Sequence, residues 1–245
     1  MGPGPRRYLE AHALARAPNR LRFFDAYGAH VVAYMSQPCE SLDHLDGRTG
    51  ALVILAAAIA TGREVLVEEQ CRACTSASVP APWVDELLLQ SLLMVGWPRT
   101  FQAAAIWRRV GSPDAAPGED GTDYSRAAEW EVRGELLCRT VYGANYERLR
   151  GNVRELHPAL EAWMITEGYG RTLGRAALDF ARRELCVIAQ TAVQGAERQL
   201  HSHLKGARNA GASPRAIAET LDAVRPLLGT AEATLADSLW NRVRE

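Results

Sequence analysis

Cysteine and long apolar runs are scarce in this sequence of 245 residues. The five cysteines are odd in number and follow a polar start, MGPGPRRYLEAH, which has none of the features of a signal peptide. We therefore expect reduced thiols in a cytoplasmic protein and not a disulfide framework. The longest apolar run, ALVILAAAIA (51–60), contains ten residues and is too short for a helix that spans a bilayer.

Excess charge of either sign is also missing, because the formal net charge at pH 7 is −1. A chain without a strong electrostatic field is not expected to bind nucleic acid or an anionic membrane. Hydrophobic residues make up 47% of the chain and charged residues 23%, which is ordinary for a globular protein with a real core. The length is sufficient for one large domain or for two domains of about 120 residues each.

Alternating strand patterns are hard to find, whereas apolar residues recur with helical spacing along most of the sequence. The pattern predicts an all-α fold. The segment GSPDAAPGEDGTDYS (111–125) is rich in glycine, proline, serine and aspartate and indicates a linker. The predicted helices cover residues 51–60, 83–95, 99–110, 129–150, 156–170, 178–195, 196–211 and 213–224.

The second half of the sequence repeats the first half at a constant offset of 133 residues, without a gap from residue 45 to residue 110. Alanine richness alone would not align helix-ending glycines and a late tryptophan in this way. We predict two copies of one helical unit, residues 1–110 and 126–245, joined by the linker 111–125. The six tryptophans are expected to be core residues. Matched pairs include Asp46 with Asp179, Gly62 with Gly195, Gly96 with Gly229 and Trp107 with Trp240.

The second copy carries a pattern that extends over a whole helical unit. Its elements are Leu178-Asp179, Arg183-Glu184-Leu185, Gln199-Leu200, His203-Leu204, Lys205-Gly206-Ala207 and Asn209-x-Gly211. This pattern resembles the carboxymuconolactone decarboxylase family, which shares a superfamily with the alkylhydroperoxidase AhpD. The resemblance implies an AhpD-like helical fold in which the two units of one chain form an intrachain pseudo-dimer. It also implies a homo-oligomer, a trimer of two-domain chains.

A Cys-x-x-Cys pair occurs in the first copy, within EEQCRACTSA (68–77). Cys71 and Cys74 can be a redox dithiol, half of a metal site, or two small packing residues on one helix face. We expect no metal site, because no second Cys-x-x-Cys exists and the histidine nearest in sequence, His44, is remote.

The AhpD branch has a reactive pattern of one glutamate, two cysteines and one histidine. In register, this pattern falls on Glu184, Ala196, Gln199 and His203 of the second copy, so the acid and the imidazole are present and both thiols are absent. In the first copy the same positions hold no reactive group, and the Cys-x-x-Cys pair lies eight residues too late. We therefore interpret Cys71 and Cys74 as packing residues, with a thiol peroxidase that uses them as an alternative hypothesis.

Glu184 and His203 are the predicted catalytic pair. The resemblance implies an enzyme that decarboxylates a lactone or related carboxylate without a metal or organic cofactor. Histidine suits delivery of a proton to carbon because its side chain titrates near neutral pH, and a buried carboxylate would orient it. The two residues lie on consecutive helices, eleven residues before and eight after the turn at Gly195, so an antiparallel pair brings them to similar heights.

Three further residues are predicted to bind the small-molecule substrate. Gln199 lies one turn before His203 on the same helix face. Arg171 has the geometry to bind a substrate carboxylate, and the resemblance places its segment, with Tyr169, along the pocket. A non-enzymatic oligomeric binding protein is the remaining alternative.

Overall fold

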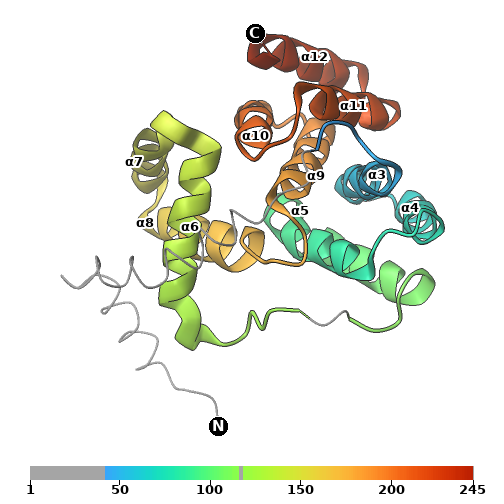
Figure 1. Ribbon diagram of the computed structural model, residues 1–245, viewed down its shortest axis with the longest axis horizontal. Coiled ribbons are helices and arrows are strands. Elements are labelled where there is room, and N and C mark those ends of the chain that lie inside the picture. Colours follow the sequence, from blue (N-terminus) through green and yellow to red (C-terminus); the bar gives the residue numbers. More distant parts are fainter. Residues whose placement is uncertain (1–41, 116–117, 245) are drawn as a thin grey trace. The chain divides into compact units, whose positions relative to one another are not determined.

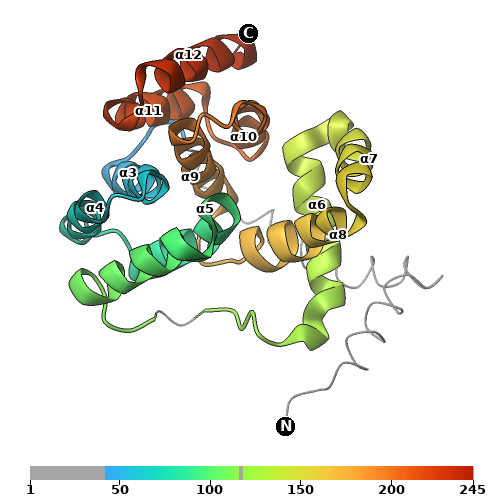
Figure 2. The ribbon, with the colours of Figure 1, turned by 180° about the vertical axis from the view of Figure 1, so that it is seen from behind.

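The computed structural model describes residues 42–115 and 118–244. Secondary structure within these ranges is helical, apart from an isolated bridge between Leu42 and Ala212 (Figures 1 and 2). The prediction of an all-α fold is therefore confirmed.

The described residues form two compact units. We call residues 42–115 and 177–244 the paired-repeat unit and residues 119–176 the middle unit. The paired-repeat unit combines helices from both predicted copies, as an intrachain pseudo-dimer requires. The division between residues 118 and 119 lies inside the predicted linker 111–125, and a second division after residue 176 separates the first part of the predicted second copy from the rest of it.

The helices of the paired-repeat unit occur as two equivalent sets. In the first copy they are α3 (Gly47–Thr61), α4 (Glu64–Ser76) and α5 (Ala81–Val110). In the second copy they are α9 (Phe180–Val193), α10 (Glu197–Asn209), α11 (Pro214–Val224), the short turn η4 (Arg225–Leu227) and α12 (Thr230–Arg244). The first residues of α3, α4 and α5 lie 133 positions before those of α9, α10 and α11, so the structure reproduces the offset of the sequence repeat.

Local signals explain why equivalent helices begin and end at equivalent positions. Asp46 and Asp179 cap α3 and α9 with nearly identical backbone angles. The Asp46 side chain accepts from the N–H groups of Arg48 and Thr49, and the Asp179 side chain accepts from that of Arg182. Gly62 and Gly195 follow these helices with φ of 72° and 61°, a left-handed conformation that favours glycine. Gly96, with φ of 74°, breaks α5 where the second copy passes from α11 to α12.

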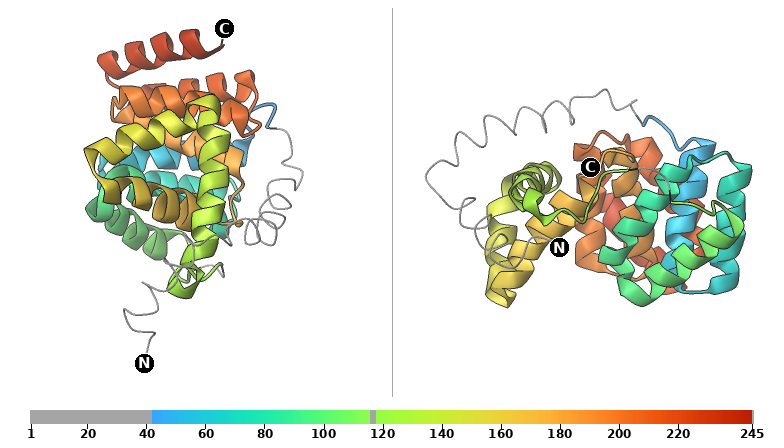
Figure 3. Two further views of the ribbon diagram at one scale, coloured as in Figure 1. Left: turned by 90° about the vertical axis from the view of Figure 1, so that its left-hand side faces the viewer. Right: turned by 90° about the horizontal axis from the view of Figure 1, so that it is seen from below.

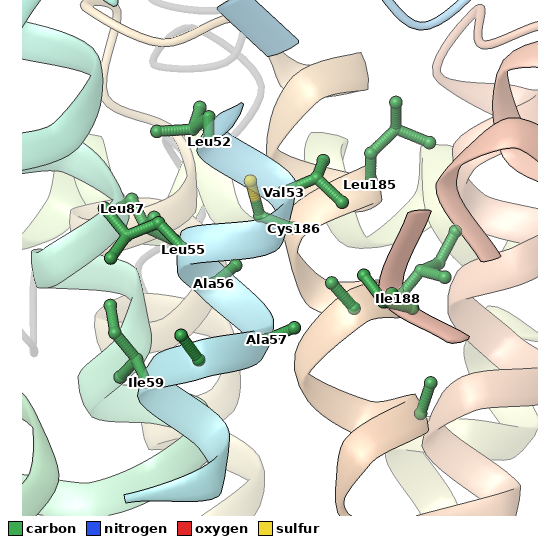
Figure 4. Packing of buried hydrophobic residues seen from close by; sticks show 14 of the residues in the cluster. Leu52, Val53, Leu55, Ala56, Ala57, Ile59, Leu87, Leu185, Cys186 and Ile188 are labelled. Carbon is green, nitrogen blue, oxygen red and sulfur yellow. The ribbon is translucent and has the colours of Figure 1, made fainter. Parts of the chain in front are cut away.

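The core of the paired-repeat unit lies between α3 and α9, which pack against one another. Leu55 and Ile59 of α3 point toward α5, whereas Val53 and Ala57 point toward α9 (Figure 4). Both helices lie between α5 on one side and α11 with α12 on the other (Figure 3). The helix α3 is apolar on nearly every side because it is covered from several directions, as its sequence predicts.

Arg182 marks the pseudo-twofold relation between the two copies. Its Nε donates to Thr49 Oγ1 at 2.9 Å, and residues 49 and 182 are themselves separated by the repeat offset. Residues that contact their own equivalents lie beside the symmetry axis of an isologous pair. The same guanidinium pairs with both capping carboxylates, Asp179 at 2.7 Å and Asp46 at 3.4 Å.

The prediction that all six tryptophans are core residues is wrong for two of them. Trp107, Trp130 and Trp240 are buried, whereas Trp97 and Trp163 are each 59% exposed. Helical spacing places a residue on a face of its helix, but it does not reveal whether another element covers that face.

The middle unit contains α6 (Ala127–Tyr142), α7 (Tyr146–Leu156), α8 (Pro158–Trp163) and a π-helical segment, η3 (Met164–Leu173), preceded by short turns at Tyr124–Arg126 and Gly143–Asn145. Two helix predictions need correction. The helix expected over 129–150 is interrupted at Gly143, where φ is 51°. The helix expected over 156–170 starts at Pro158 as anticipated but continues as a π-helix from Met164.

The helices α6 and η3 touch through their backbones. A Cβ added at Gly134 would lie 2.0 Å from the carbonyl oxygen of Ile165, and one added at Gly170 would lie 1.9 Å from that of Trp130. Only glycine permits this approach, because any side chain would force the two helices apart.

We predict that Gly134→Ala lowers the free energy of unfolding by about 3 kcal/mol or more, because the added methyl group collides with backbone that cannot move aside. Urea unfolding followed by circular dichroism measures the change. The matched control is Gly151→Ala in α7, where a Cβ meets nothing within 4 Å. This control should raise stability by about 0.5–1 kcal/mol through helix propensity. Equal stabilities of the two variants would contradict the close helix contact.

Candidate functional site

Glu184 of α9 and His203 of α10 meet inside the paired-repeat unit. His203 Nδ1 lies 2.8 Å from Glu184 Oε2, within hydrogen-bond distance. Glu184 is fully buried and His203 is only 5% exposed. The predicted juxtaposition across the turn at Gly195 is therefore present in the structure.

The contact gives the two nitrogens of the His203 ring different roles. A carboxylate accepts hydrogen bonds, so an ionised Glu184 fixes the tautomer that carries its proton on Nδ1. In the neutral ring, Nε2 of His203 is then the nitrogen without a proton. Nucleophile- and proton-transfer sites are built in this way, with one ring nitrogen oriented by an acid and the other left for the reaction.

The second oxygen of Glu184 adds an unusual feature. Within the described ranges, Oε1 is buried and has no hydrogen-bond partner. Leaving a buried acceptor unsatisfied costs about 1–3 kcal/mol, and such groups are rare in folded proteins. An acceptor of this kind is suited to a donor that arrives with a ligand. No sequence pattern predicts this unpaired oxygen, because the donors that could pair with it come from residues distant in sequence.

The three predicted substrate-binding residues fall in different places. Gln199 is exposed on α10, one turn before His203. Tyr169 is buried in the middle unit, where it packs edge-on against Tyr142 with ring centroids 6.4 Å apart. Their part in substrate binding stays a prediction.

Arg171 is already engaged within the middle unit. Its Nε donates to the carbonyl oxygen of Gly121 at 2.7 Å, and its Nη1 contacts Glu167 at 2.7 Å and the Tyr124 hydroxyl at 2.9 Å. A substrate carboxylate would therefore compete with Glu167 for this guanidinium. The proposed role of Arg171 as an anion ligand requires that exchange.

The equivalent positions of the first copy hold Ala51 and Gln70 in place of Glu184 and His203. Nearby, Cys71 is 1% exposed, Cys74 is fully buried, and Cys74 Sγ donates to the carbonyl oxygen of Ala51 at 3.5 Å. Burial, reinforced by Glu68, raises the pKa of Cys71 to about 12. Burial, together with Cys71, raises the pKa of Cys74 to about 12. Thiols of this kind are protonated at neutral pH and pack as small apolar groups.

Across 42–115 and 118–244, His, Cys, Asp and Glu side chains form no group of three or more suited to hold a metal ion. Over the same part of the chain, no helix combines the length and apolarity needed to cross a membrane.

Comparison with known proteins agrees with the tandem organisation. The model of the carboxymuconolactone decarboxylase family matches residues 20–109 and 158–241, one segment in each copy. The chain belongs to this family. The two matched segments confirm a tandem member with two units in one chain.

Two curated relatives match part of the chain. Peroxisomal protein 2 of Schizosaccharomyces pombe is 27% identical over 141 residues, which is 56% of this chain and 64% of the relative. An uncharacterized 15.0 kDa protein from the nqo9-nqo10 intergenic region of Paracoccus denitrificans is 39% identical over 71 residues, 28% of this chain and 53% of the relative. The chain thus spans between about half and two thirds of the lengths of the relatives it matches.

We predict that Cys71 and Cys74 react with iodoacetamide at about pH 8 on the order of a thousand times more slowly in the folded protein than after unfolding. The raised pKa leaves the thiol form dominant until pH approaches about 12, and only the thiolate is nucleophilic. Peptide mass spectrometry after timed alkylation measures the rate at each cysteine. Rapid labelling of either thiol in the folded protein would contradict the packing role and support the thiol peroxidase hypothesis.

Proposed function

We propose that this protein is a cofactor-free acid–base enzyme that acts on a small lactone or a related carboxylate. The observation that supports the proposal is the buried contact between His203 and Glu184. Membership of the carboxymuconolactone decarboxylase family favours loss of CO₂ from a substrate that carries a carboxylate beside a lactone ring.

The reaction consists of loss of CO₂ and delivery of a proton. The bond between carbon and the departing carboxylate breaks, and its electron pair moves into the lactone carbonyl to give an enolate. A proton must then reach the carbon atom that lost CO₂. Protonated His203 donates it from Nε2 and returns to neutral imidazole, and solvent restores the proton before the next turnover.

Glu184 stabilises the protonated form of the His203 ring. Its Oε2 orients the ring through Nδ1 and stabilises the imidazolium by charge, which matters most in a site shielded from water. Its free Oε1 can accept a hydrogen bond from a substrate hydroxyl or from a bound water molecule. Gln199, Tyr169 and Arg171 are the proposed substrate contacts.

His203→Gln is expected to fold normally and to lower kcat by about 10²–10⁴-fold, because glutamine has the size to replace the ring but cannot transfer a proton. Glu184→Gln retains an acceptor for Nδ1–H but no charge and should lose about 10²-fold. CO₂ release and lactone absorbance, followed over a panel of carboxylated γ-lactones, measure turnover.

Two matched controls separate proton transfer from general damage to the fold. His201→Gln removes the partly buried histidine two residues away, and Gln70→Ala changes the position equivalent to His203 in the first copy. Both controls should retain the wild-type kcat. A His203→Gln variant with wild-type turnover, or a wild-type protein that neither turns over nor binds any lactone of the panel, would contradict the proposal.

We also propose that three chains associate, as the likeness to ring-forming family members implies. Light scattering coupled to size-exclusion chromatography should then give about three times the chain mass of 26.8 kDa. A monomeric mass at micromolar concentration would contradict this assembly.

A further inference from the structure

A buried polar network joins α5 of the first copy to α9 of the second copy. Arg183, the residue directly before Glu184, has no exposed surface. Its Nη2 pairs with Glu86 Oε2 at 2.8 Å, and its Nη1 donates to Gln90 Oε1 at 3.2 Å. Nε of the same guanidinium donates to the carbonyl oxygen of Leu178 at 3.0 Å, so the side chain is held on three sides.

Gln90 contacts Arg183 twice. Besides accepting from the guanidinium, its Nε2 donates to the backbone carbonyl oxygen of Arg183 at 3.2 Å. Further along α9, Gln190 Nε2 donates to Ser91 Oγ at 2.7 Å. The helix α5 therefore holds α9 at two points, one immediately before Glu184 and one six residues after it.

The equivalent interface between α11 and α3 is built without these groups. Gly50 stands at the position equivalent to Arg183, Ala223 at that of Gln90, and Val224 at that of Ser91. Glu219, the equivalent of Glu86, is one-third exposed, pairs with Arg215 on its own helix at 2.7 Å and accepts a hydrogen bond from the Leu45 N–H at 2.7 Å. The equivalent helix pair therefore packs with Gly50 and Ala223 at the two positions that hold Arg183 and Gln90.

The equivalent helix pair packs without a buried guanidinium. Burying the charges of Arg183 and Glu86 carries a desolvation cost that their ion pairing only offsets. The ion pair occurs beside the copy that keeps the acid–base pair. Fixing the side chain and the carbonyl of residue 183 together fixes the rotation and the axial height of α9 at residue 184. A catalytic group displaced by about 1 Å can cost about 10²-fold in rate.

We infer that Glu86 and Gln90 of the first copy are positioning residues for Glu184 and His203 in the second copy. The expected effect on kcat rests on the proposed function, whereas the expected effect on the orientation of the His203 ring does not. Through these two residues the first copy contributes to the site, although it has no reactive groups at its own equivalent positions.

The test is Gln90→Met, which keeps the side-chain length and removes both hydrogen bonds. We expect kcat to fall about tenfold or more with KM changed less than twofold, because substrate contacts stay and the orientation of the pair is lost. Solvent exchange of the His203 Nδ1–H proton, followed by NMR and assigned with His203→Gln, should accelerate by a similar factor.

Two further variants complete the experiment. Val84→Ala truncates another buried side chain of α5 and should lower stability while leaving kcat and the exchange rate as in the wild type. Ser91→Val installs the residue that the second copy uses at this position, so it should fold, and it should lower kcat severalfold. Wild-type kcat and exchange in Gln90→Met and Ser91→Val would overturn the inference, and so would equal effects from Val84→Ala.

Failure of the inference and failure of the proposed function give different results. If His203→Gln abolishes turnover while Gln90→Met leaves kcat and exchange unchanged, the positioning role is wrong and the acid–base function stands. If His203→Gln keeps full turnover while Gln90→Met still accelerates exchange, the positioning role stands and the acid–base function is wrong.

Discussion

The packing of α3 against α9 is the constraint on which the rest of the paired-repeat unit depends. Both helices are buried along most of their length. They relate the two copies by a pseudo-twofold axis, beside which Arg182 contacts its own equivalent, Thr49. Once these helices are fixed, α10 must return beside α9, and the turn at Gly195 sets the height at which it does so. The contact between Glu184 and His203 follows from that return.

The sequence predicts most of this arrangement because the signals are local and repeated. Capping aspartates and left-handed glycines recur at one offset, so the helices begin and end at equivalent residues. The Glu184–His203 pair is predictable from family register and helix geometry. Three features are not predicted because they depend on residues distant in sequence. The π-helix at Met164 adjoins α6 through glycine contacts, and Trp97 is exposed. The Gln90–Arg183 contact joins residues 93 positions apart.

Duplication has left the two copies with one fold and different chemistry. The second copy keeps an acid and an imidazole where the first has Ala51 and Gln70, and the first fills the adjoining space with protonated cysteines. The helix interfaces also differ: a buried Arg183–Glu86 ion pair lies beside Glu184, whereas Gly50 stands at the position equivalent to Arg183. A Cys-x-x-Cys motif is therefore a poor guide to function here, since burial and register decide whether the thiols can react.

We propose above all that Glu184 holds His203 as the Nδ1–H tautomer, which leaves Nε2 to exchange protons with a substrate. The most direct test is the pair of ¹⁵N chemical shifts of the His203 ring in protein labelled with [¹⁵N]histidine, at a pH where the ring is neutral. We expect a protonated, pyrrole-like shift for Nδ1 and an unprotonated, pyridine-like shift for Nε2. The opposite tautomer, in which Nδ1 accepts a proton from a neutral Glu184, would contradict it.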